Sequence, residues 1–164
     1  MSATTSDAVN AQAPINLKVI LIAGLVAGTL DMTGACVVAW LQAGVTPVRV
    51  MRYIASGLLG PSALTGGAGV AALGLAMHYF IATTWATVFY VASRKIRFLV
   101  DQPIVSGLLY GIVVYVVMNF IVVPLSLVRR GSPTLSSRLI QMSILMVCIG
   151  LPIALIVRRF SKAT

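Results

Sequence analysis

Charged residues are scarce in this chain, and acidic residues are almost missing. Only 9% of the 164 residues are charged, and only three are acidic. An ordinary soluble domain carries about 25% charged residues. Since 59% of the residues are hydrophobic, the chain has too little charge to cover a soluble surface and is too apolar to be disordered. The composition predicts a membrane protein.

Cysteine, histidine and catalytic motifs are scarce as well. The chain has two cysteines and one histidine, and it contains no Walker loop, dinucleotide fingerprint, HExxH or GxSxG motif. One histidine and one buried aspartate fall short of the usual ligand set of a metal ion. The sequence therefore predicts no metal site, no cofactor and no catalytic residue, and it favours a protein that is not an enzyme.

The positive charge lies at the ends of the apolar runs. Twelve Lys and Arg give a net charge of +9, but no basic helix with interleaved aromatics indicates nucleic-acid binding. Their positions are typical of anchors at anionic lipid head groups. Five arginines fall on the side away from the termini and form a candidate head-group site: Arg49, Arg52, Arg129, Arg130 and Arg138. Seven basic residues fall on the other side, which favours cytoplasmic termini: Lys18, Arg94, Lys95, Arg97, Arg158, Arg159 and Lys162.

The apolar runs predict an all-α transmembrane helix bundle. A spanning helix needs about 20 apolar residues, and the chain offers four such runs. We expect a flexible tail over 1–16, a single transmembrane domain over 17–159 and a C-terminal tail over 160–164. The predicted spans are 17–43, 66–93, 104–128 and 137–157.

Between the first two spans, residues 46–60 predict a short interfacial amphipathic helix. At 100° per residue, Arg49, Arg52 and Ser56 share one face, and the opposite face is apolar. This segment is too polar and too short to cross a bilayer, so we expect it to lie in the membrane interface.

Three polar residues in different spans share one predicted depth. Counted from the terminal side, Asp31, His78 and Asn119 lie about 21 to 22 Å into the membrane at ~1.5 Å per residue. An ionisable group at the centre of a span costs at least about 2.5 kcal/mol, so a partner or a function must compensate for it. We expect the three side chains to converge near the membrane midplane.

Small residues share a helix face with each of these polar residues. Gly24 and Gly28 precede Asp31, Gly74 precedes His78, and Gly107 with Gly111 precedes Asn119 at four-residue spacing. Glycine lets neighbouring backbones approach closely, so these faces predict helix packing. Further along, Pro124 and Pro152 each remove a helical hydrogen bond and predict a kink.

Two interpretations of the polar residues stay open. They could form a structural clasp that holds three helices in register, since such hydrogen bonds stabilise membrane proteins by about 0.6 to 2 kcal/mol each. They could also form a proton or small-ligand site, because a carboxyl and an imidazole in hydrocarbon can exchange a proton.

Four segments resemble small uncharacterised bacterial inner-membrane proteins and, more distantly, the YagU-like inner-membrane proteins. They are GTLDMTGA around Asp31, YIASGLLG in the predicted interfacial helix, GLAMHYFIA around His78 and YGIVVYVVMNFIVVPLS around Asn119. The resemblance covers about two-thirds of the chain, from Gly24 to Ser126. It implies a multi-pass location in the bacterial inner membrane and supports the three polar positions, but it supplies no substrate.

The favoured function is binding or transport of a proton or small solute at the midplane cluster. The alternative is a non-catalytic accessory or scaffold subunit of a larger membrane complex, and an intramembrane enzyme comes third. The expected partners are the bilayer and its anionic head groups, with a homo-oligomer or larger complex possible. A cavity that reaches Asp31 would favour transport, lipid-facing small-residue stripes would favour the subunit, and Ser143 beside His78 would favour the enzyme.

Overall fold

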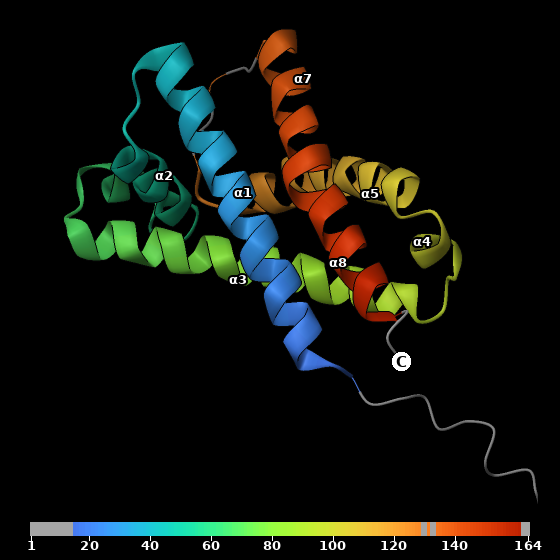
Figure 1. Ribbon diagram of the computed structural model, residues 1–164. Helices are drawn as coiled ribbons and strands as arrows, with labels where there is room; N and C mark the ends of the chain where they lie inside the picture. Colours follow the sequence, from blue (N-terminus) through green and yellow to red (C-terminus); the bar gives the residue numbers. More distant parts are fainter. Residues whose placement is uncertain (1–14, 129–130, 132–133, 162–164) are drawn as a thin grey trace, which may run out of the picture.

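The fold is described from a computed structural model (Figure 1), which describes residues 15–128, 131 and 134–161. Most of the predicted tails, 1–16 and 160–164, lie outside this range. Most of the described residues are helical, and none of them forms a strand. Within them, four helices are long and apolar enough to span a membrane. The chain is an all-α, multi-pass membrane protein.

The four spans are single or composite helices. Span one is α1 (Leu17–Ala43), and span two is α3 (Ala68–Ser93). Span three joins α5 (Pro103–Val117), the π-helix η2 (Met118–Val122) and α6 (Val123–Leu125). Span four joins α7 (Leu135–Ile144), the π-helix η3 (Leu145–Gly150) and α8 (Leu151–Ser161). Three short elements connect the spans: α2 (Pro47–Leu59), the 3₁₀ helix η1 (Pro61–Thr65) and α4 (Phe98–Asp101).

The helix ends follow local signals, with small shifts from the predicted bounds. Gly44 ends α1 in the left-handed conformation at φ 61°, where glycine carries no steric penalty. Span three ends at Leu125 rather than 128, because Ser126 is extended at ψ 170°. Span four begins at Leu135, where the Thr134 hydroxyl accepts a hydrogen bond from the Ser137 amide, and it runs past 157 to Ser161.

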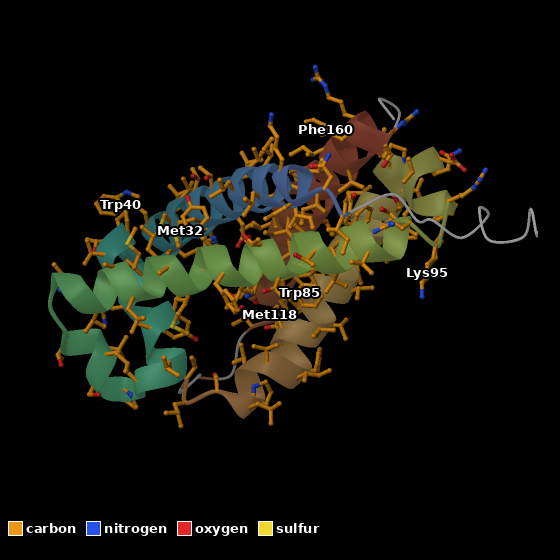
Figure 2. All side chains as sticks on the ribbon, turned by 90° about the horizontal axis from the view of Figure 1, so that it is seen from below. Met32, Trp40, Trp85, Lys95, Met118 and Phe160 are labelled. Carbon is orange, nitrogen blue, oxygen red and sulfur yellow. The ribbon has the colours of Figure 1, made fainter. Side chains whose placement is uncertain are left out.

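The spans cross steeply rather than running parallel. In Figure 1, α1 and the α7–α8 helix lie side by side across α3 and α5. Helix α1 begins, and α8 ends, at the same end of the bundle. In Figure 2, Trp40 and Lys95 mark opposite ends, and Trp85 and Met118 lie between them. We call the half that holds the start of α1, the end of α3 and α8 the terminal half, and the other the distal half.

The apolar core fills the terminal half. Its fully buried side chains come from α1, α3, α5 and the last span, and the largest are Phe89, Ile153, Val19, Val114 and Val157. Phe89 meets the ring of Tyr110 edge-on with centroids 4.9 Å apart. The Tyr110 hydroxyl donates a hydrogen bond to the Trp85 carbonyl at 2.6 Å, so this polar atom has a partner within the core.

The five glycines predicted for helix packing are all buried at helix crossings. A Cβ atom at Gly24 would lie 2.7 Å from the Thr83 Cα of α3. At Gly111 a Cβ would overlap the Met146 backbone, and at Gly74 it would overlap the Met51 carbonyl of α2. Gly28 and Gly107 are similarly enclosed. Except at Gly28, where a Cβ would meet only side chains, the neighbouring backbone occupies the space that a side chain would need.

A π-helix precedes each of the two prolines for which a kink was predicted. Pro124 follows η2 and Pro152 follows η3. A proline has no amide to donate to the carbonyl four residues earlier, and its ring clashes with that carbonyl. Widening the preceding turn into a π-helix relieves both problems and keeps the span continuous.

Candidate functional site

A cavity of about 580 Å³ occupies the distal half. Its walls come from the second half of α1, one face of α2, the middle of α3, the end of span three and the start of span four. All four spans therefore surround it, as does the short amphipathic helix. The cavity extends along α1 from Asp31 to Gln42, which corresponds to about 16 Å along the helix axis.

Asp31 lies at the inner end of this cavity. Its side chain is half-buried on α1, close enough to His78 of α3 for an electrostatic interaction and also within the electrostatic range of Cys148. Among the described residues, its carboxyl oxygens accept no hydrogen bond and form no ion pair. The carboxyl is therefore available to a molecule that enters the cavity.

His78 lines the cavity from α3. Its Nε2 donates a hydrogen bond to the Gly28 carbonyl at 2.8 Å, because a carbonyl can only accept. The neutral ring therefore carries its proton on Nε2, and Nδ1 is the atom that can take up another proton. The edge-on ring of Tyr79, 5.7 Å away between centroids, helps to fix this orientation.

Asn119 lies on η2, and its contacts differ from those of the other two residues. Its Nδ2 donates to the Tyr115 carbonyl of its own helix at 2.9 Å. Its neighbours Met118 and Val122 line the cavity, but Asn119 is not among the lining residues. The structure thus places Asp31 and His78 on one cavity, and the convergence of Asn119 with them stays a prediction.

The outer part of the cavity has polar residues that the sequence analysis missed. Gln42 lies in the last turn of α1, Tyr53 on α2 and Gln141 on α7, and all three are exposed. Ser126 and Ser137 complete this polar rim. The sequence held a signal for this rim, because Gln42 and Gln141 are polar residues inside predicted spans, as Asn119 is. The depth count did not reveal it because Gln141 lies nearer the membrane surface.

Helix α2 has the expected exposed polar face, but its apolar face packs against the bundle in a way that was not expected. Arg49 is exposed, as a wet face requires. The apolar face does not lie wholly outward, because Ile54 lines the cavity and the Met51 backbone lies against Gly74 of α3. Helix α2 is therefore a wall of the cavity as well as an amphipathic surface helix.

The candidate head-group arginines are only partly described. Arg49 and Arg138 are exposed, and Arg52 is half-buried with an Nε atom that has no hydrogen-bond partner among the described residues. Arg129 and Arg130 lie outside the described residues. None of the described arginines or lysines lines the cavity.

Other chemistries have little support in the described part of the chain. It holds no group of three or more His, Cys, Asp or Glu that could bind a metal ion. Ser143 is exposed, is not part of the cavity wall and donates to the Leu139 carbonyl of its own helix at 2.9 Å.

The chain was compared with protein families, curated proteins and solved structures, and none of them matches it. The resemblance to YagU-like inner-membrane proteins therefore stays a prediction.

Proposed function

We propose that the protein binds a proton or small solute in the distal cavity and passes it across the membrane. One observation carries this proposal: the only histidine of the chain and the only acidic residue of its described spans line the same cavity. Ionisable residues are rare in spans and commonly mark ion or substrate pathways. Here two such residues lie on different helices and face one space.

The arrangement suits proton exchange. Asp31 makes no hydrogen bond to a described residue, so it can bind a proton or a ligand without breaking a structural bond. His78 has one nitrogen fixed by Gly28 and one able to accept a proton. A proton could therefore pass between the carboxyl and the imidazole inside the cavity.

Passage to the other side requires the terminal half to open. Asp31 lies fourteen residues from Leu17, a distance of about 21 Å along α1. Buried side chains such as Val19, Ala23 and Ala27 fill this interval. The π-helices η2 and η3 border the cavity, where a wide turn permits a local change of helix register. We propose that these segments move when the terminal half opens.

The alternatives receive less support. The predicted packing glycines lie in contacts within the bundle, whereas a docking subunit would present such stripes to a partner through the lipid. An enzyme that uses Ser143 would need this residue beside His78, but Ser143 is exposed outside the cavity. The cavity that reaches Asp31 favours the transport proposal over both alternatives.

The proposal includes a location. Seven basic residues on the terminal side against five on the distal side support cytoplasmic termini in the bacterial inner membrane. The cavity would then open away from the cytoplasm. The YagU-like resemblance is part of this proposal, and anionic lipid head groups at Arg49 and Arg138 would anchor the distal side.

Proton flux in vesicles tests the proposed function. Purified protein is reconstituted into vesicles that contain a trapped pH-sensitive dye, and a pH step is applied. We expect flux above that of empty vesicles, and Asp31→Asn should abolish the difference because an amide keeps the shape but cannot ionise. Asp101→Asn is the matched control, since Asp101 is exposed on α4 outside the cavity. Wild-type flux equal to that of empty vesicles would contradict proton transport.

A further inference from the structure

We infer that the cavity binds an organic cation with an apolar body, which pairs with the Asp31 carboxylate in exchange for a proton. This inference rests on the proposed function of the same cavity and names the class of its solute. It is carried by three properties of the cavity: size, charge and lining.

The size exceeds what a proton or a bare metal ion needs. Cavities for small organic molecules measure about 300 to 1,000 Å³, and the distal cavity of about 580 Å³ lies inside this range. Its depth along α1, from Asp31 to Gln42, suits an elongated or multi-ring molecule better than a hydrated ion.

The charge of the wall selects for cations. The protein carries a net charge of +9, yet no described lysine or arginine lines the cavity. Asp31 is the one lining residue with a carboxylate. A cation that pairs with Asp31 compensates for its negative charge in a low-dielectric space, whereas this carboxylate repels an anion.

The rest of the lining fits an apolar body. Met32, Met77 and Met118 contribute flexible, polarizable side chains from three spans, and methionine surfaces adapt to ligands of varied shape. Tyr53 at the outer end offers an aromatic ring, which attracts cations at its face. Gln42 and Gln141 supply hydrogen-bonding groups near the entrance.

Exchange with a proton follows from competition for one carboxyl. A proton on Asp31 removes the negative charge that attracts the cation, so the two bind in turn. The titratable groups that face this carboxyl are His78 from α3 and Cys148 from η3. Tyr53 of α2 lines the same space, and the lining residues of α7 are uncharged. Where Asp31 is protonated before binding, the cation displaces this proton to water, and binding therefore weakens as the pH falls.

Binding of tetraphenylphosphonium to the full-length protein in detergent tests the inference. This probe carries one positive charge inside an apolar shell, and tetraphenylborate has nearly the same shape with the opposite charge. We expect saturable binding of the cation with proton release and no competition by the anion. Asp31→Asn should raise Kd by about thirtyfold or more, because removal of one member of a buried charge pair costs at least about 2 kcal/mol.

Two further variants keep the test decisive. Asp101→Asn should bind the probe like the wild type, because Asp101 is exposed on α4. Ala35→Phe leaves Asp31 in place but fills the cavity from one turn along α1, so it should also remove binding, and it serves if Asp31→Asn does not fold. Equal binding of the cation and the anion, or binding unchanged in both cavity variants, would overturn the inference.

The outcomes also separate this inference from the proposed function. Proton flux that depends on Asp31, without any binding of the cation, would overturn the substrate class and leave proton transport in place. Cation binding that depends on Asp31, without transport of either species in vesicles, would uphold the binding site and contradict the transport role.

Discussion

The two halves of this bundle use the same four spans in opposite ways. In the terminal half, alanine, valine and one aromatic cluster around Phe89 leave side chains with no exposed surface. In the distal half, the spans enclose a cavity of about 580 Å³ that holds Asp31 and His78. The comparison indicates that the packed half fixes the helices while the hollow half carries the ionisable groups.

Glycine contacts join the two halves. Gly107 and Gly111 bring α5 against η3, next to the inner end of the cavity, and Gly74 brings α2 against α3 in the distal half. In the bilayer, close backbone packing replaces the hydrophobic effect as a source of helix association. The glycine crossings can therefore hold the spans in place around a space that supplies little packing of its own.

The largest expected effect comes from emptying the packed half. Phe89→Ala should lower the free energy of unfolding by about 3 to 5 kcal/mol, because Phe89 is fully buried and its removal leaves a cavity. The matched variant is Met77→Ala in the distal half, where Met77 is half-buried beside an existing space. This change should cost only about 1 kcal/mol. Denaturant titrations in detergent compare the two, and equal costs would show that the halves are packed alike.

Next in size is a disturbance of a glycine crossing. Gly111→Ala places a Cβ atom against the Met146 backbone, and such overpacking should cost about 1 to 3 kcal/mol. Gly69→Ala on α3 is the control, since a Cβ there meets no atom within 4 Å. The control should stabilise the helix by about 0.5 to 1 kcal/mol. If both variants unfold at the same denaturant concentration, the crossing is not as tight as described.

The spans and their glycine faces could be predicted from the sequence, because both depend on local patterns. Span one has the predicted bounds, 17 and 43, since apolar length and a terminal glycine set them. The end of span four was harder to predict, because Arg158 and Arg159 resemble a boundary. Instead they lie in the last turn of α8, where cations interact favourably with the helix dipole.

The cavity could be predicted only in part. A depth count placed Asp31 and His78 at one level, because the rise per residue is constant along a helix. It could not show that α2 closes a wall, since this depends on how Met51 meets Gly74 across two helices. It also could not show that Asn119 donates to its own helix, because a helical asparagine can turn inward or back along the backbone.

A smaller effect is expected from one hydrogen bond in the packed half. Tyr110→Phe removes the hydroxyl that donates to the Trp85 carbonyl and should cost about 0.6 to 1.7 kcal/mol. Tyr79→Phe is the comparison, because the Tyr79 hydroxyl bonds to the exposed Thr29 at 3.0 Å, and it should cost less. A larger loss for Tyr79→Phe in the same detergent titration would place the more important bond at the exposed contact between α1 and α3.

The smallest effect on stability is expected at Asp31, the residue on which the proposed function depends. Asp31 accepts no hydrogen bond from a described residue, and His78 and Asn119 bond to the Gly28 and Tyr115 carbonyls instead. Neither Asp31→Asn nor Asp31→Leu should therefore leave a polar group without a partner, and both should change the free energy of unfolding by less than about 1 kcal/mol.

A structural clasp gives the opposite result for one of these variants. If Asp31 held His78 or Asn119 in register, Asp31→Leu would strand a buried polar group and cost about 1 to 3 kcal/mol, whereas Asp31→Asn would be tolerated. Denaturant titration of both variants, beside proton flux in vesicles, separates the two cases. Two stable variants that both lack flux would place Asp31 in the hollow half as a functional group, and its charge would then serve the solute rather than the fold.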